Sequence, residues 1–283
     1  MAYFVQEEET LDRDGLVALQ RRKLTVMLTD VLATNAFYRN KFGGQSIDEV
    51  VNGFASLPFT CRAEIQQDQR DNPPYGTNLT YPVERYNRLH QTSASTGAPL
   101  RGLDRAEDWN WWKRCWGILY RAAGVTAADR FIFPFSFGPF IGFWGAFESA
   151  VELGNLCLPA GGMTTSARLK FLIENGVTML GCTPTYALRM AEVAREEGID
   201  LAGSTVRGLI VAGEPGGSIP ATRAAIESAW GARAFDHSGL SEVGPFGFEC
   251  EEAPGGMHMM ESEFIVEAID PDSQRATPEG EVG

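Results

Sequence analysis

The chain has 283 residues, 44% of them hydrophobic, so it has room for one large or two modest globular domains with a sizeable core. Its 24 basic and 37 acidic residues give a net charge of -13, which argues against nucleic acid or an anionic membrane as the main partner. No apolar run reaches the length of a bilayer span, and the acidic stretch from Met1 to Thr10 lacks the features of a signal peptide, so we expect a cytoplasmic protein.

Cysteine and histidine usage is informative as well. The five cysteines are odd in number, scattered, and form no Cys-x-x-Cys pair, which is typical of free thiols in a reducing compartment. The three histidines are too few to hold a metal ion without other types of ligand.

Helices are predicted in the first part of the chain. Apolar residues at helical spacing predict an amphipathic helix from Leu16 to Leu32. Thr60 is the expected N-cap of a short helix that reaches about Arg70 and that the following Asp-Asn-Pro-Pro-Tyr-Gly ends. A third helix, from Arg105 to Ala123, carries tryptophans on several faces, so we expect it to be buried with its tryptophans in the core.

From Asp129 onward, short apolar runs alternate with helical segments. The predicted strands are Phe131 to Phe135, Leu156 to Pro159, Thr178 to Cys182, Leu209 to Ala212 and Ala232 to Asp236. The predicted helices are Phe140 to Leu153, Thr165 to Asn175, Thr185 to Glu197 and Pro220 to Trp230. This alternation predicts an α/β fold, a mainly parallel sheet flanked by helices, with ligands at the carboxyl ends of the strands. A further strand is expected from Glu263 to Ile269.

A hydroxyl-rich segment precedes this α/β region. Gln-Thr-Ser-Ala-Ser-Thr-Gly-Ala-Pro-Leu, at Gln91 to Leu100, combines hydroxyl side chains with Gly97 and Pro99, which suit neither a helix nor a central strand. Hydroxyl and free backbone N–H groups in a loop of small residues suit a phosphate. Taken alone, the segment is explained equally well as an ordinary polar surface turn.

Two later segments favour the phosphate loop. They are Ala-Gly-Glu-Pro at Ala212 to Pro215 and Phe-Asp-His-Ser-Gly-Leu-Ser-Glu-Val-Gly-Pro at Phe235 to Pro245. With the hydroxyl-rich segment, and in the same order, they resemble the signature segments of the adenylate-forming (acyl/aryl-CoA synthetase) superfamily, which read Thr-Ser-Gly-Thr-Thr-Gly-Lys-Pro and Tyr-Gly-Leu-Ser-Glu. Leu-Pro-Phe-Thr at Leu57 to Thr60, followed by a Pro-Tyr-Gly loop, resembles the phenylacetate-CoA ligase branch. The resemblance runs from about Leu57 to Gly283 and covers only the N-terminal part of a typical member.

The resemblance implies ATP-dependent activation of an aryl carboxylic acid to an aryl-adenylate and pyrophosphate, followed by thioester formation with CoA. The implied cofactors are ATP, Mg²⁺ and CoA, and the implied partner is a small-molecule aryl acid, with no nucleic acid and no membrane. The sequence does not decide between a monomer and a homodimer. An adenylating enzyme with an amine or carrier-protein acceptor, and a nucleotide-binding protein that no longer catalyses, are the alternatives.

Candidate catalytic residues follow from the resemblance. The hydroxyl-rich loop aligns with the phosphate loop of the family and contributes Thr92, Ser93, Ser95, Thr96 and Gly97. Ala94 and Ala98 replace a glycine and the lysine of that loop, and Arg101 is close enough in sequence to supply the missing charge. Glu242 aligns with the glutamate that holds magnesium, an ion that prefers oxygen ligands. Without the upstream loop, Glu242 reads as an exposed carboxylate at a turn.

Further segments align with the nucleotide and acid sites. The segments that flank the nucleotide in relatives correspond here to Gly213, Glu214, Pro215, Asp236, His237, Ser238, Gly239 and Ser241. Ser241 is expected at the α-phosphate, and Ser238 replaces the usual tyrosine. The segment that lines the aryl pocket corresponds to Phe135, Ser136, Phe137, Gly138 and Phe140. Core packing explains these aromatic residues equally well.

The family resemblance also leads to expectations about zinc binding and about the division into domains. Cys250 and His258 are spaced to reach one zinc ion, as in some relatives, although two ligands do not make a site and a buried thiol near a surface histidine is the alternative. We expect an N-terminal helical region at 1–90 and an ATP- and acid-binding α/β core at 91–283, without the mobile C-terminal domain of the family.

Overall fold

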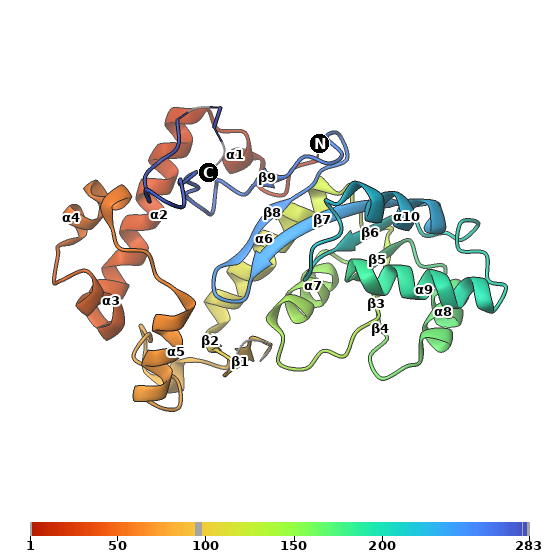
Figure 1. The fold of residues 1–283 in the computed structure, drawn as a ribbon, viewed down its shortest axis with the longest axis horizontal. Helices are drawn as coiled ribbons and strands as arrows, with labels where there is room; N and C mark the ends of the chain where they lie inside the picture. The colour runs from red at the N-terminus through yellow and green to blue at the C-terminus, as the bar shows by residue number, and fades with distance from the viewer. Residues whose placement is uncertain (1, 94–97, 279, 282–283) are drawn as a thin grey trace.

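The computed structural model describes residues 2–93, 98–278 and 280–281. A seven-stranded sheet with the order β4-β3-β5-β6-β7-β8-β9 lies at its centre (Figure 1). Strands β4, β3, β5, β6 and β7 are parallel to one another, whereas β8 is antiparallel to both of its neighbours, β7 and β9. The strands are β3 Arg130–Phe133, β4 Leu156–Pro159, β5 Met179–Cys182, β6 Gly208–Val211, β7 Arg233–Leu240, β8 Gly244–Phe248 and β9 His258–Met259.

Helices cover both faces of the sheet because its buried strands carry apolar side chains on both sides. Phe131 and Phe133 of β3 pack in one hydrophobic cluster with α6 (Ala106–Ala122) and α7 (Ile141–Glu152). Ile132, between them in sequence, packs in a second cluster with residues of α8 (Thr165–Glu174), α9 (Pro184–Glu196) and α10 (Pro220–Trp230). The alternation of side chains along a strand therefore separates two cores, one on each face.

The N-terminal part is helical and lies beyond one end of the sheet (Figure 1). It comprises α1 Gln6–Glu9, α2 Arg13–Thr34, α3 Ala36–Lys41, α4 Ile47–Asn52, α5 Arg62–Asp71 and two short 3-10 helices, Phe54–Ser56 and Val83–Arg85. A separate antiparallel pair, β1 (Arg88–Gln91) and β2 (Arg101–Asp104), follows on either side of the hydroxyl-rich segment. None of the helices in the described ranges is long and apolar enough to cross a membrane.

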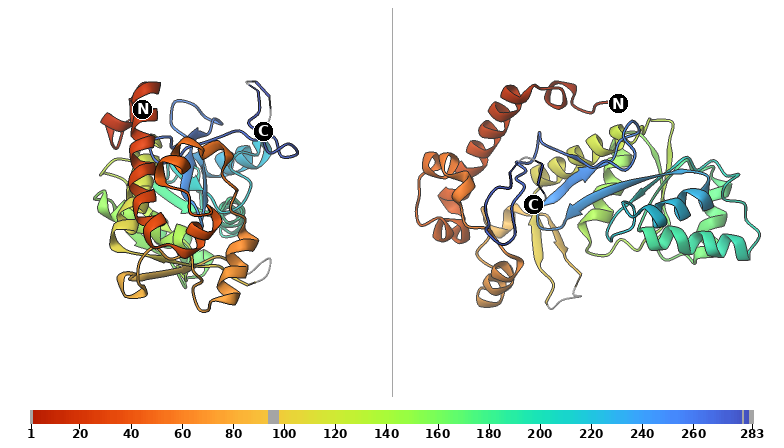
Figure 2. Two further views of the ribbon diagram at one scale, coloured as in Figure 1. Left: turned by 90° about the vertical axis from the view of Figure 1, so that its left-hand side faces the viewer. Right: turned by 45° about the horizontal axis from the view of Figure 1, so that its top comes forward.

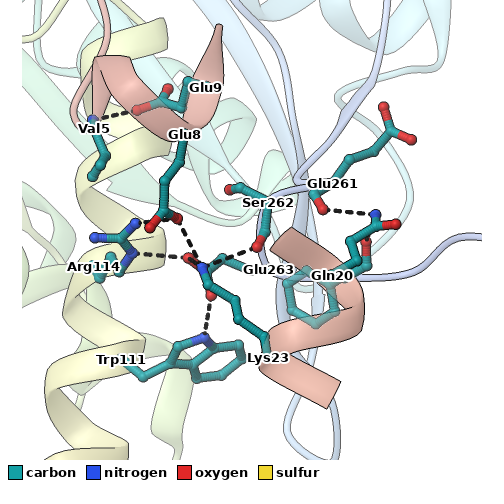
Figure 3. Close-up of polar contacts among 11 residues, drawn as sticks. Val5, Glu8, Glu9, Gln20, Lys23, Trp111, Arg114, Glu261, Ser262 and Glu263 are labelled. Atoms are coloured by element: carbon teal, nitrogen blue, oxygen red, sulfur yellow. Dashed lines mark hydrogen bonds and ion pairs between the residues drawn. The ribbon is translucent and has the colours of Figure 1, made fainter. Parts of the chain in front are cut away.

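A buried glutamate ties the N-terminal helices to the core (Figure 3). The side chain of Glu263, only 4% exposed, accepts hydrogen bonds from Arg114 of α6 at 2.8 Å, from Lys23 of α2 at 2.9 Å and from the indole of Trp111 at 2.9 Å. Glu8 of α1 pairs with the same arginine and lysine. Because buried charges are tolerated only when they are paired and hydrogen-bonded, this cluster holds α1 and α2 against α6.

The predicted α/β fold with a mainly parallel sheet is confirmed. The helix predicted from Leu16 to Leu32 is α2, and the tryptophan-rich helix is α6, in which Trp109, Trp112 and Trp116 are buried. The five predicted strands correspond to β3 through β7, and the four predicted helices between them correspond to α7 through α10.

Three local predictions were wrong. Thr60 does not cap α5, because the helix begins at Arg62 and the N–H of Cys61 is bound by the Glu64 carboxylate at 2.6 Å. Glu263 to Ile269 form no strand, since Glu263 belongs to the ion cluster and only Ile269 makes an isolated bridge. Strand β7 does not end at Asp236, because antiparallel pairing with β8 extends it to Leu240.

Candidate active site

The hydroxyl-rich segment is closed at its base by Thr92. The backbone N–H of Thr92 donates to the Leu100 carbonyl at 2.9 Å, and the N–H of Leu100 donates to the Thr92 hydroxyl at 3.0 Å. Helix α5 packs alongside, with Gln66 donating to the carbonyl of Ala98 at 2.8 Å. The candidate residues Ser95, Thr96 and Gly97, together with Ala94, lie outside the described residues.

Glu242 is presented by the turn of the β7–β8 hairpin. The antiparallel pairing that lengthens β7 carries the turn away from the parallel part of the sheet, and its tip lies beside β1 and β2 (Figure 2). The N–H of Val243 donates to the Leu240 carbonyl at 3.2 Å and closes the turn. Ser241 and Glu242 are therefore held by backbone pairing opposite the base of the hydroxyl-rich segment.

Arg62 connects the two motifs. Its guanidinium contacts the Glu242 carboxylate at 2.6 Å through Nη1 and donates to the Thr92 hydroxyl at 2.7 Å through Nη2. Its Nε is buried and has no hydrogen-bond partner within the described residues. A planar guanidinium with unused donors, placed between a hydroxyl and a carboxylate, suits the oxygens of a phosphate group.

Sequence reasoning missed Arg62, although one signal was available. Arg62 is the first residue of α5. The partial positive charge of a helix N-terminus disfavours a cation there, so an arginine at this position indicates an anionic partner. Arg101, the residue expected to supply charge to the loop, donates instead to the carbonyl of Pro74 at 2.9 Å.

A cavity of about 520 Å³ opens at this junction. Its polar end is formed by residues of both motifs, namely Arg62, Thr92, Ser93, Ser241 and Glu242. Part of its remaining wall is aromatic and comes from α6, from the chain between β3 and α7, and from α7, namely Trp112, Trp116, Tyr120, Phe135, Phe140 and Phe143. A second cavity of about 410 Å³ shares Thr92, Trp112 and Glu242 with the first. We call the end of the cavity formed by both motifs the polar mouth, and the part lined by the aromatic residues the aromatic chamber.

The candidate residues divide between this cavity and its surroundings. Those that line it, besides the polar end, are Gly213, His237, Gly239, Phe135 and Phe140. Those outside its lining are Glu214, Pro215, Asp236, Ser238, Ser136, Phe137 and Gly138. Phe137 packs on Trp144 instead, with ring centroids 4.7 Å apart, and the Glu214 carboxylate accepts the N–H of Thr185 at 2.8 Å.

Asp236 lies beneath the turn that follows β6. Its carboxylate is buried, which raises its pKa. A Cβ added at Gly217 would lie 2.3 Å from that carboxylate, so only glycine allows the turn to approach. The backbone N–H of Asp236 donates to Glu249 at 2.7 Å, and Glu249 is paired with Arg223. Arg223 also donates to the carbonyl of Gly217 at 2.8 Å, so this network holds the turn after β6 against β7.

The tryptophans of α6 have a second role that composition did not reveal. The sequence predicted that they pack in the core, and Trp112 and Trp116 do so, yet both also line the cavity with Tyr120. These residues are four apart, so they lie along one face of the helix. That spacing was visible in the sequence, but only the position of β7 shows that the face borders a cavity.

Cys250 and His258 do come together. His258 Nε2 lies 3.2 Å from the Cys250 sulfur, and its ring stacks on Phe248. Among the described residues no group of three histidine, cysteine or acidic side chains is arranged to hold a metal ion. Zinc binding therefore stays a prediction.

Comparison with known proteins finds relatives over nearly the whole chain. Phenylacetate-coenzyme A ligases of Pseudomonas putida and of Escherichia coli (strain K12) are each 31% identical over 97% of it. The chain spans 62% and 63% of the lengths of these two relatives. No protein-family model matches the chain.

A solved structure agrees with these relatives. 2-Hydroxyisobutyryl-CoA ligase in complex with 2-HIB-AMP and CoA superposes with a TM-score of 0.91 at 25% identity, over 99% of this chain and 61% of the ligase. By sequence and by fold, this chain is similar to CoA ligases of the adenylate-forming superfamily. The curated relatives place this similarity in the phenylacetate-CoA ligase-like branch.

Proposed function

We propose that the protein activates a carboxylic acid with ATP, giving an acyl-adenylate and pyrophosphate, and then transfers the acyl group to the thiol of CoA with release of AMP. The observation that carries the proposal is the bridge from Thr92 through Arg62 to Glu242 at the polar end of the cavity. In the first step an oxygen of the carboxylate bonds to the α-phosphorus of ATP. The bond from that phosphorus to the bridging oxygen breaks, and pyrophosphate leaves with its electron pair.

The residues of the polar mouth have distinct roles in this scheme. Arg62 and the hydroxyls of Thr92 and Ser93 contact the phosphates that leave, with Ser95, Thr96 and Gly97 as further candidates. Arg62 supplies the positive charge that Ala98 lacks. The oxygens of Glu242 and of the hydroxyl groups fit a magnesium ion, which would neutralise phosphate charge when bound. Gly213 and Ser241 line the cavity, and we propose that they contact the nucleotide.

The aromatic chamber is the proposed site of the acid. Phe135 and Phe143 stack with ring centroids 4.0 Å apart, and Trp116 of α6 lines the same cavity. Flat aromatic walls complement a planar ring, so we propose an aryl acid. Holding the carboxylate at the polar mouth would convert a bimolecular attack on ATP into an oriented reaction within one complex.

Acid-dependent exchange of pyrophosphate into ATP on the full-length protein tests this proposal. We expect exchange with aryl acids and its loss, by about 100-fold or more, in Glu242→Ala. Absence of exchange with every acid would instead favour a nucleotide-binding protein without catalysis. Adding CoA, amines or a carrier protein to the preformed adenylate identifies the acceptor, and only CoA should give product.

A further inference from the structure

The ring of His90, on β1, is held in a fixed orientation from two sides. Its Nδ1 lies 2.9 Å from a carboxylate oxygen of Asp104 on β2. One face of the ring stacks on Trp109 of α6, with centroids 5.2 Å apart and planes 18° from parallel. Trp109 is fixed in turn, because its indole donates to Glu148 of α7 at 2.6 Å. Packing and hydrogen bonding together therefore leave the imidazole little freedom to rotate.

The other nitrogen of this ring, Nε2, has the properties of a base. A carboxylate accepts hydrogen bonds and does not donate them, so Nδ1 carries a proton. In the neutral imidazole the lone pair is then on Nε2. Among the described residues no hydrogen bond is made to Nε2. A histidine oriented by a carboxylate on its far nitrogen is the arrangement in which imidazole takes a proton from a nucleophile.

The pair borders the second cavity of the site. His90 and Asp104 both line this space of about 410 Å³, which meets the polar mouth at Thr92, Ser241 and Glu242. Much of its remaining wall comes from α5, β1 and β2, on the side of the N-terminal helices. With the acid in the aromatic chamber, this cavity gives a second molecule a separate approach to the mouth.

His90 lies close to the mouth along its own strand. It precedes Thr92 by two residues, and alternate residues of a strand point to the same face, about 7 Å apart. The N–H of Thr92 still pairs with the Leu100 carbonyl at 2.9 Å, so the pairing of β1 with β2 continues up to the mouth. Because Thr92 contacts Arg62 there, His90 is one strand repeat away. A base at that distance acts on a nucleophile directly or through one water.

A purely structural role explains the pair less well. Strands β1 and β2 are already joined by backbone pairing along their length. The two side chains are only 7% and 14% exposed, and a buried pair of this kind adds little stability over apolar residues of similar size. Other charges nearby have their own partners, since Arg88 binds Glu148 at 3.0 Å and Asp108 binds Arg105 at 2.9 Å. Asp104 is therefore the charge that faces Nδ1.

We propose that His90 is the general base of the acyl-transfer step and that Asp104 positions its ring. His90 Nε2 takes the proton of the CoA thiol as the sulfur bonds to the carbonyl carbon of the acyl-adenylate. The bond from that carbon to the phosphate oxygen breaks, and AMP leaves with its electron pair. The proton then passes to water, which restores the neutral imidazole. The inference rests on the proposed function, because that function supplies both the adenylate and the thiol.

Measuring the two steps separately on the full-length protein tests this role. Pyrophosphate exchange reports adenylate formation, and mixing the preformed, enzyme-bound adenylate with CoA gives the rate constant of thioester formation. His90→Gln is similar in size but takes up no proton. At pH 7 its loss in thioester formation should exceed any loss in exchange by about 100-fold or more.

The outcomes separate this inference from the proposed function. Equal losses in both steps would show that His90 only supports the phosphate loop, which overturns the inference and leaves the proposed function standing. Exchange without thioester formation in the wild type would overturn the inference as well. A wild-type protein without exchange for any acid would remove the proposed function and the inference together.

The pH dependence distinguishes a base from a structural histidine. An alkyl thiol ionises in solution at about pH 8.5, so above that pH the nucleophile forms without a base. The defect of His90→Gln in thioester formation should therefore shrink by about 10-fold between about pH 7 and about pH 9.5. A defect of the same size at both ends of this range would contradict the inference.

Two further variants test the orientation of the ring. Asp104→Asn keeps the shape of the pair, but its amide donates to Nδ1, which moves the ring proton to Nε2 and removes the base. This variant should show the same selective loss, and it provides the comparison even where His90→Gln fails to fold. Leu89→Ala is the matched control, because Leu89 is 42% exposed and lies on the other face of β1. A wild-type ratio of the two steps in Asp104→Asn would refute the positioning role.

Discussion

Two arginine–carboxylate pairs at opposite ends of the sheet differ in how completely they are satisfied. Asp129, before β3, accepts from Arg207 at 2.9 and 2.7 Å, from the Thr178 hydroxyl at 2.7 Å and from the N–H of Thr126 at 2.8 Å. Among the residues that the structure describes, Arg62, at the cavity, makes one contact each to Glu242 and Thr92, and its buried Nε has no partner. We call the Arg207–Asp129 pair saturated, because several donors bind its carboxylate. We call the Arg62–Glu242 pair unsaturated, because the guanidinium of Arg62 has N–H donors left for a ligand.

This difference separates stability from binding. The saturated pair lies where the strands begin, and burial, which would raise the pKa of Asp129, is outweighed by its hydrogen bonds, so that the pKa falls to about 2. The unsaturated pair lies at the end of the sheet where strands leave toward their turns, which is the edge where parallel sheets bind ligands. An unpaired buried donor lowers stability in the free protein and is relieved when a phosphate oxygen arrives.

The largest effect should come from Arg62→Ala. Removing a preorganised cation from the site of charge transfer should lower kcat/KM for pyrophosphate exchange by about 100-fold, with little change in Tm. Arg62→Lys keeps the positive charge but loses the planar guanidinium, so its kcat/KM should lie between those of the wild type and Arg62→Ala. Arg101→Ala is the matched control, because its guanidinium contacts Pro74 rather than the motifs. If Arg101→Ala lowers exchange as much as Arg62→Ala, the proposed difference between the two arginines is lost.

A smaller effect, on stability alone, is expected from Asp129→Asn. Lowering the pKa of Asp129 from 3.8 to about 2 corresponds to about 2 kcal/mol in the free energy of unfolding at pH 7. Urea denaturation should show a loss of this size, while pyrophosphate exchange per folded molecule stays at the wild-type level. A drop in exchange without a loss of stability would refute the separation drawn above.

The smallest expected effect concerns the pH dependence of stability, which tests the role of the Arg207–Asp129 pair. The folded pKa of Asp129 is depressed, so its contribution is fully present above the unfolded value of 3.8 and is lost as pH falls toward 2. Wild-type protein should therefore lose more stability than Asp129→Asn between pH 5 and about 2, and the two curves should converge. Parallel curves over that range would show that Asp129 is not responsible. Urea midpoints at each pH provide the measurement.

The sequence predicted those parts of the fold that depend on local pattern. Apolar runs such as Leu209 to Ala212 became strands close to the expected residues, because a strand such as β6 (Gly208–Val211) is buried on both faces. The extension of β7 through Ser238 and Gly239 could not be read locally, because serine and glycine are weak strand formers and the pairing with β8 decides their conformation. The start of α5 is decided locally, because Glu64 in its own first turn accepts the N–H of Cys61, which takes the cap position expected for Thr60.

The candidate site was predicted as motifs but not as a geometry. The family resemblance assigned Thr92 and Glu242 to one site, and in the structure both side chains contact Arg62. The residue that joins them, Arg62, lies 30 positions before Thr92 and 180 before Glu242, and no periodicity or spacing connects it to either. The grouping of His237 with nucleotide contacts came from motif order alone. The side chain of His237 lines the cavity because of its orientation on β7, which the motif does not reveal.

Strand β7 sets the spacing between the aromatic chamber and the polar mouth. Its first half is paired with β6 and its second half with β8, with a register shift between Ser238 and Gly239, so the hairpin turn is held by backbone pairing rather than by an adjustable loop. In the proposed function, an acid would therefore bind along a rigid strand. Variation in the length of the acid would be tolerated poorly, whereas variation in its width would meet side chains of the chain between β3 and α7, which can change rotamer without disturbing the sheet.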